Sequence, residues 1–176
     1  MGVIAVVGKY RTGKSYLMNK LFLQELKKDT SSPMPLEMSK GFQVSPTINP
    51  CTKGLWLCRR LLHFEDENGT THPVIVIDTE GLGAFDEDEN HDAKIFLLAL
   101  LLSSLLLYNS VGTIDENALN TLSLVINLSK QIQIKQNKGE EVDADELAEC
   151  FPRFFWILRD FSLRLIDSDG NKISAR

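Results

Sequence analysis

The sequence predicts an α/β fold with a mainly parallel sheet, and three consecutive segments support this prediction. Residues 3–7 are all apolar, as expected of a strand buried on both faces of a parallel sheet. The octapeptide GKYRTGKS at residues 8–15 follows directly and matches the pattern G-x-x-x-x-G-K-[ST]. Residues 15–28 then carry leucines at helical intervals. A glycine-rich loop between a strand and a helix is the arrangement that wraps a phosphate chain, so we expect a P-loop NTPase sandwich of three layers.

The rest of the chain alternates between apolar segments and polar turns. In chain order we expect strands at 54–64 and 72–81, a buried helix and a core strand within 95–108, a helix over 115–136, and a last core strand at 151–161. Asn68 and Gly69 indicate a hairpin turn between the first two of these strands. The run at 95–108 is too short to span a membrane, and Ser103 and Ser104 divide it.

Two polar stretches are expected to be loops. Residues 29–50 carry four prolines among many serines and threonines, and residues 137–149 form an acidic run.

Length and composition indicate one ordinary globular domain. The chain has 176 residues, of which 43% are apolar and 24% charged. The net charge is −5 and the lysines and arginines form no cluster, which argues against a nucleic-acid partner. Three cysteines without metal-ligand spacing favour a reduced, cytoplasmic compartment. Position 6 is Val6 where a myristoylation signal needs Ser or Thr, and the chain ends without a prenylation motif.

The loop at residues 8–15 predicts a nucleotide site with a metal ion. Gly8 and Gly13 let the backbone curl so that its N–H groups face phosphate oxygens. Lys14 is expected to reach the β and γ phosphates, and the Ser15 hydroxyl to ligate Mg²⁺. The other residues expected to line the nucleotide here are Tyr10, Arg11, Thr12 and Tyr16.

A carboxylate after the strand at 72–81 is the second expected component. Asp78 follows four apolar residues and is predicted to lie at the carboxyl edge of the sheet. There its carboxylate would help to hold the Mg²⁺ ion. Glu80 and Gly81 are expected to begin a loop that senses the γ-phosphate through the Gly81 N–H. Thr47 and Thr52 both offer a hydroxyl for the metal shell, and we prefer Thr52 because Lys-Gly and a strand follow it; either threonine could instead be a turn residue.

Five motifs in a fixed order resemble one family. They are GKYRTGKSYLMNKL at 8–21, TKGLWL at 52–57, DTEGLG at 78–83, LLYNSVGTI at 106–114 and FFWILRDFSL at 154–163. Over nearly the whole chain they resemble the guanylate-binding proteins, dynamin-like large GTPases that the resemblance places in innate immunity. The related atlastins share the arginine-bearing loop and the Arg-Asp pair, but DTEGLG and YNSVGTI are more similar to the guanylate-binding proteins.

The resemblance implies roles for three residues. Asp160 is implied to select guanine, because its carboxylate can accept from N1–H and the exocyclic amine, and Arg159 is expected at the same site. On their chemistry alone, Arg159 and Asp160 could equally form an ion pair. Arg11 is implied to be an arginine finger supplied in cis, which neutralises charge on the transferred phosphoryl group when two GTPase domains meet. Without the family, Arg11 could be a solvated or ion-paired structural residue.

These features predict a GTPase that binds GTP or GDP with Mg²⁺ and forms a nucleotide-dependent homodimer. Its expected catalytic residues are Arg11, Lys14, Thr52 and Glu80. One alternative is a nucleotide-gated interaction module with little or no turnover. Another is an ATP-using P-loop enzyme, which Asp160 disfavours.

The sequence also departs from the family. Pro50 stands where the family often has a serine that helps position the attacking water, so turnover is expected to be weaker or differently routed. Residues 1–176 are expected to be part of a GTPase domain, truncated at the C-terminus and without the helical stalk that the resemblance implies. Membrane association is possible in the family, although no lipidation signal is present.

Overall fold

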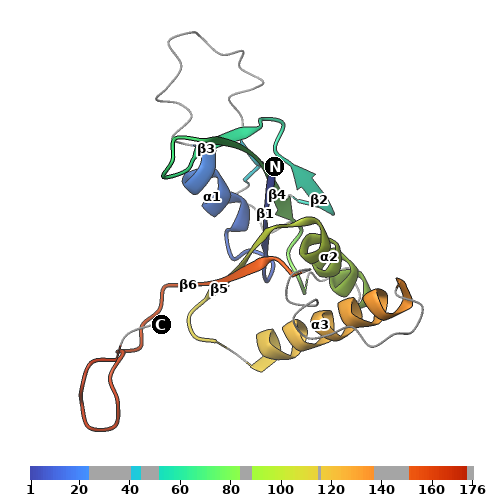
Figure 1. Cartoon of the computed structure of the whole chain (residues 1–176). Coiled ribbons are helices and arrows are strands. Elements are labelled where there is room, and N and C mark those ends of the chain that lie inside the picture. The colour runs from blue at the N-terminus through green and yellow to red at the C-terminus, as the bar shows by residue number, and fades with distance from the viewer. Residues whose placement is uncertain (24–40, 45–51, 84–88, 115, 137–150, 174–176) are drawn as a thin grey trace.

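The sheet is the centre of the fold. A computed structural model describes residues 1–23, 41–44, 52–83, 89–114, 116–136 and 151–173 (Figure 1). Within them, six strands form one sheet in the order β2-β4-β1-β5-β6, with β3 also paired to β4. The strands are β1 (Gly2–Val7), β2 (Leu55–Leu57), β3 (Leu62–Glu65), β4 (Thr71–Thr79), β5 (Leu105–Val111) and β6 (Arg153–Arg159). The helices are α1 (Lys14–Met18), which continues into the π-helical turn η1 (Asn19–Leu23), α2 (Glu89–Leu102) and α3 (Glu116–Gln136).

Most strand pairs are parallel, as predicted. β1 pairs in parallel with β4 and β5, and β5 pairs in parallel with β6. Among the described strands, only β2 and β3 run antiparallel to their neighbour β4. The carboxyl ends of β1, β4, β5 and β6 therefore meet at one edge of the sheet, where doubly wound folds place their ligands.

Helices cover both faces of the sheet, which confirms the three-layer prediction (Figure 1). Along β1 the side chains alternate between the two faces of the sheet. Ala5 and Val7 belong to the core cluster that contains residues of α2 and α3. Ile4 and Val6 belong to a second cluster that contains Met18 of α1. Complete burial of a valine stabilises the fold by about 1.5–3 kcal/mol, so β1 anchors both layers.

The strand predicted at 54–64 is wrong as a single element. Five steps of chain separate Leu57 from Leu62, but their partners Ile77 and Val74 on β4 are only three steps apart. Two extra residues must therefore bulge out between β2 and β3, although Cys58 N still donates to Val76 O at 2.8 Å. The predicted hairpin turn is present, with Asp66 N donating to Thr70 O at 3.0 Å.

The apolar run at 95–108 breaks at the predicted serines. Ser104 lies at the break, where its hydroxyl accepts from Val3 N at 2.8 Å and donates to Val3 O at 3.0 Å, which ties the start of β5 to β1. The helix before it was expected to be buried, and that is wrong for one side: the three leucines Leu98, Leu101 and Leu102 are 44–54% exposed. The described helices include none with the length and apolarity needed to cross a membrane.

The remaining elements agree with prediction in type and differ in packing. In α3, Val125 is buried, whereas Leu119 and Ile126 on the expected apolar face are exposed. β6 was expected to be a core strand, but it is the edge strand of the described sheet, and Phe154 and Phe155 are exposed. Its position is set by pairing order, which periodicity does not encode.

The helix predicted at 15–28 begins at Lys14 and changes to π-helical winding at Asn19. The Asn19 side chain pairs there with both backbone groups of Phe42 at 2.8 Å. The rest of that helix, most of the predicted loops, and Thr47 and Pro50 lie outside the described residues.

Candidate phosphate-binding site

The glycine-rich loop connects β1 to α1 at the carboxyl edge of the sheet. Gly8 has φ 146°, and a Cβ on it would lie 2.1 Å from the backbone oxygen of Asn109. No other residue type fits such an approach, which explains the first glycine of the motif. Arg11 adopts φ 59°, a left-handed conformation that is uncommon outside glycine, and its side chain is exposed.

The segment after β4 forms backbone hydrogen bonds with this loop. Tyr10 N donates to Leu82 O at 2.9 Å, and Leu82 N donates to Gly8 O at 3.1 Å. Gly81 makes this contact sterically feasible, because a Cβ there would lie 2.1 Å from Tyr10 Cα. The two segments expected to contact phosphate, GKYRTGKS and DTEGLG, are therefore joined backbone to backbone.

Side chains at the ends of β5 and β6 donate hydrogen bonds to the same loop. The Thr12 carbonyl accepts from Asn109 Nδ2 at 2.9 Å and from Arg159 Nη1 at 2.7 Å. The prediction that Arg159 binds the nucleotide stays a prediction; in the structure its guanidinium donates to the backbone of the phosphate loop. It forms no ion pair with Asp160 in the described structure, so the ion-pair alternative has no support. Asp160 lies exposed just beyond β6, at the same edge of the sheet, with φ 53°.

Lys14 is a buried cation at the first turn of α1. Its side chain is only 6% exposed, and Nζ donates to the backbone oxygen of Lys9 at 3.2 Å. Burial lowers the Lys14 pKa from 10.5 to about 8, and the nearby carboxylates, Asp78 first among them, partly oppose that shift. The electrostatic attraction between a buried ammonium and an arriving anion is stronger than that of an ammonium in water.

Three oxygen-bearing side chains converge beside Lys14. Ser15 Oγ donates to Asp78 Oδ2 at 2.5 Å, Thr52 Oγ1 donates to the same oxygen at 3.4 Å, and the two hydroxyl oxygens are 3.4 Å apart. Burial raises the Asp78 pKa, while the hydrogen bond from Ser15 and the charge of Lys14 act in the opposite direction. The structure thus brings together the residues that the sequence predicted as metal ligands.

This oxygen set fits a hard divalent cation. Asp78 Oδ1 is buried and accepts no hydrogen bond from any residue that the structure describes. A buried carboxylate oxygen without a donor is costly, and a cation would satisfy it. Two hydroxyls and one carboxylate, all oxygen donors, are the ligand type that Mg²⁺ prefers.

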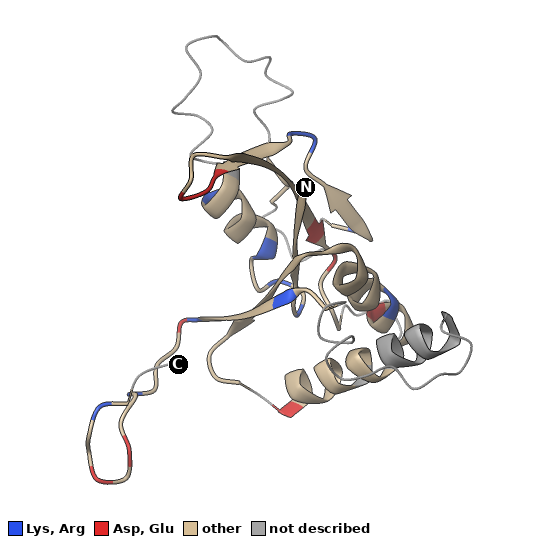
Figure 2. Cartoon of the chain, in the orientation of Figure 1, with Lys and Arg blue, Asp and Glu red and all other residues tan. Residues whose placement is uncertain are grey.

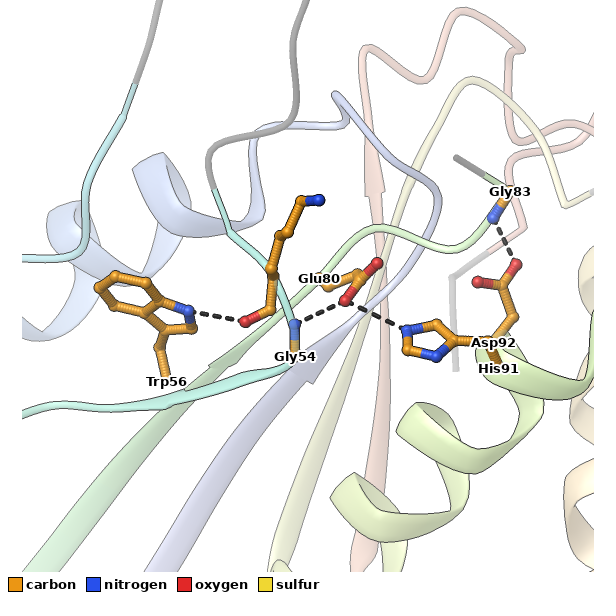
Figure 3. Close-up of polar contacts among 7 residues, drawn as sticks. Gly54, Trp56, Glu80, Gly83, His91 and Asp92 are labelled. Carbon is orange, nitrogen blue, oxygen red and sulfur yellow. Dashed lines mark hydrogen bonds and ion pairs between the residues drawn. The ribbon is translucent and has the colours of Figure 1, made fainter. Parts of the chain in front are cut away.

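Glu80 links the segment after β4 to two others (Figure 3). Its Oε2 accepts from Gly54 N at 2.5 Å, and its own N–H donates to Gly54 O at 2.9 Å. His91 Nε2, in the first turn of α2, lies 3.3 Å from the same Oε2. Asp92 Oδ2 accepts from Gly83 N at 2.5 Å, so α2 contacts the DTEGLG segment twice.

Two residues that were predicted to contact the nucleotide, Tyr16 and Tyr10, are partly exposed. Tyr16 is 49% exposed, and Lys20 Nζ lies 5.6 Å from the centre of its ring. Tyr10 is half-buried, and its backbone N–H donates to Leu82 O. Figure 2 shows Lys and Arg interspersed with Asp and Glu over the described ribbon.

Comparison with known proteins decides the family. The family model "Guanylate-binding protein, N-terminal domain" matches residues 1–175. The chain belongs to the guanylate-binding protein family. Guanylate-binding protein 1 of Chlorocebus aethiops is 40% identical over 176 residues, and guanylate-binding protein 7 of Homo sapiens is 42% identical over 176 residues. These alignments cover 98% of this chain but only 27% and 24% of the relatives, so the chain spans about a quarter of their length.

The family resemblance seen in the five motifs is thus confirmed. Two polar residues that shape this guanylate-binding protein site were not predicted from sequence. Asn109 has a recognisable signal, since it is an amide at the end of the apolar run of β5. His91 has none, because its contact with Glu80 depends on where α2 packs.

Proposed function

We propose that this domain binds a guanine nucleotide together with Mg²⁺ and hydrolyses GTP. The observation that supports this best is the convergence of Ser15, Thr52 and Asp78 beside the buried ammonium of Lys14. An ammonium and a hard-cation site side by side suit a ligand that carries several phosphate charges. The names of the relatives, guanylate-binding proteins, support guanine as the base.

Binding of the phosphates falls to the loop at 8–15. Its backbone N–H groups and Lys14 would hold the phosphate oxygens, with a charged oxygen replacing the Lys9 carbonyl as the partner of Nζ. Ser15, Thr52 and Asp78 would hold Mg²⁺, which neutralises charge on the β and γ phosphates when bound. Asp160 would accept from the N–H groups of guanine.

Hydrolysis requires a positioned water and charge neutralisation. Both side-chain contacts described for Glu80 fall on Oε2, so Oε1 is the oxygen that would orient the attacking water. The Gly81 N–H would contact the γ-phosphate. Arg11, exposed on the loop, would neutralise the charge that develops on the transferred phosphoryl group when a second copy of the domain faces it.

The test is nucleotide affinity in a charge-matched pair of variants. Lys14→Ala should weaken binding of a fluorescent GTP analogue with Mg²⁺ by about 10- to 100-fold, because a charge-assisted hydrogen bond contributes roughly 1.5–3 kcal/mol. Lys172→Ala removes the same charge from the exposed segment after β6 and should bind as the parent does. Circular dichroism verifies that both variants are folded. Equal affinity in the two variants would show that the loop is not the nucleotide site.

A further inference from the structure

Glu80 is fixed from two sides. It is buried, and its carboxylate and backbone N–H form a reciprocal pair with Gly54, at 2.5 Å and 2.9 Å. Gly54 comes two residues after Thr52, one of the residues proposed to hold Mg²⁺. The position of the Glu80 carboxylate therefore also fixes the backbone that carries the Thr52 hydroxyl.

His91 supplies the contact from the other side. Its Nε2 lies 3.3 Å from Glu80 Oε2, the oxygen that also accepts from Gly54 N (Figure 3). With its proton on Nε2, the His91 ring can donate a hydrogen bond to this oxygen. Asp92, the next residue, accepts from Gly83 N at 2.5 Å. The first turn of α2 thus contacts the chain on both sides of Gly81.

We propose that His91 is a positioning residue for GTP hydrolysis, acting through Glu80. By donating to Oε2 from α2, it holds the Glu80 carboxylate against the Gly54 N–H and so keeps Thr52 beside Ser15 and Asp78. The contact that carries this proposal is the one between His91 and the Glu80 carboxylate, so the effect on the nucleotide site would be transmitted through Glu80. This inference rests on the proposed function and extends it to a side chain outside the sequence motifs.

The first test measures the geometry without any nucleotide. In the whole chain, His91→Leu removes the donor at similar size, and His91→Gln restores an N–H donor on a flexible amide. With ¹⁵N-labelled glycine, the Gly54 amide should exchange with solvent at least about tenfold faster in His91→Leu than in the parent, because a hydrogen bond to a charged group is weakened. In His91→Gln it should exchange within about threefold of the parent rate.

A matched control separates this effect from general destabilisation. His63 is an exposed histidine on β3, and His63→Leu makes the same substitution away from Glu80. It should leave exchange at Gly54 unchanged. Equal exchange at Gly54 in the parent and in His91→Leu would overturn the proposal, as would His91→Gln exchanging as fast as His91→Leu.

The second test measures chemistry. In single-turnover hydrolysis with Mg²⁺, His91→Leu should lower the rate about tenfold with the GTP dissociation constant within about twofold, and His91→Gln should recover most of the rate. A fall in affinity with an unchanged rate would contradict a positioning role. If the parent chain binds GTP and does not hydrolyse it, the hydrolytic part of the proposed function fails, while the Gly54 exchange still decides whether His91 positions Glu80.

Discussion

Replacing Gly81 by alanine should separate the phosphate loop from the segment that follows β4. The added Cβ would lie 2.1 Å from Tyr10 Cα and 2.6 Å from Tyr10 N. Both are backbone atoms, so no change of rotamer relieves the contact. Carbon atoms pack at about 3.5–4.0 Å, and the two segments must therefore move apart by more than about 1 Å.

The cost follows from the bonds that this movement breaks. Tyr10 N to Leu82 O and Leu82 N to Gly8 O are the hydrogen bonds that join the segments. Each contributes about 1 kcal/mol net, and leaving a buried partner unsatisfied costs roughly 1–3 kcal/mol. We expect Gly81→Ala to lower the free energy of unfolding by about 2–4 kcal/mol, a large share of the 5–15 kcal/mol that is typical of a domain.

Urea denaturation followed by circular dichroism measures this change. With a slope of about 2 kcal/mol per molar urea, in the middle of the usual range, the midpoint should fall by roughly 1–2 M. Gly2→Ala is the control, because its Cβ would meet only the Val74 Cγ2 methyl at 3.2 Å and the Ser104 hydroxyl at 3.7 Å, both side-chain atoms. It should shift the free energy of unfolding by less than about 1 kcal/mol. Equal midpoints for Gly81→Ala and the parent would refute the steric reasoning.

Three further predictions concern the nucleotide. The Lys14 pKa of about 8 should rise when phosphate binds, so nucleotide binding takes up a proton and weakens as pH rises through 8. Between pH 7 and pH 9 the dissociation constant should increase about tenfold. Calorimetry at pH 9 in two buffers of different ionisation enthalpy should detect the uptake of about 0.9 proton per nucleotide. The same affinity at both pH values would mean that Lys14 is not the titrating partner. Asp160→Asn should raise affinity for XTP relative to GTP in a competition assay, because an amide can donate to the extra carbonyl of xanthine; an unchanged ranking would show that Asp160 does not recognise the base. Arg11→Ala should slow single-turnover hydrolysis by at least about 100-fold, some 2.7 kcal/mol, with little change in GTP affinity, and Arg11→Lys should rescue poorly; hydrolysis by Arg11→Ala at the parent rate would make Arg11 a structural residue.

Local patterns in the sequence predicted much of the fold. The strand, loop and helix at the N-terminus follow from residues that are neighbours in the chain, and the break before β5 follows from two serines. Asp78 and Ser15 were placed together because parallel strands present their carboxyl ends at one edge.

Contacts between distant segments could not be predicted in this way. The Thr12 carbonyl receives donors from residues 97 and 147 positions away. The contact of the Arg159 guanidinium with the loop backbone was not predicted, and nucleotide binding by Arg159 stays a prediction. The edge position of β6 and the exposure of Leu119 likewise depend on which neighbour each element packs against.

The bulge between β2 and β3 has a consequence for association with other chains. An edge strand presents free backbone groups that can pair with another polypeptide, and interruptions or charged side chains discourage such pairing. The β2 and β3 side has both, since its strands are only three and four residues long and Arg59 and Arg60 lie in the bulge. β6, at the opposite edge, runs without interruption for seven residues and exposes Phe155. Strand addition to the described sheet is therefore favoured at β6 and opposed at β2 and β3.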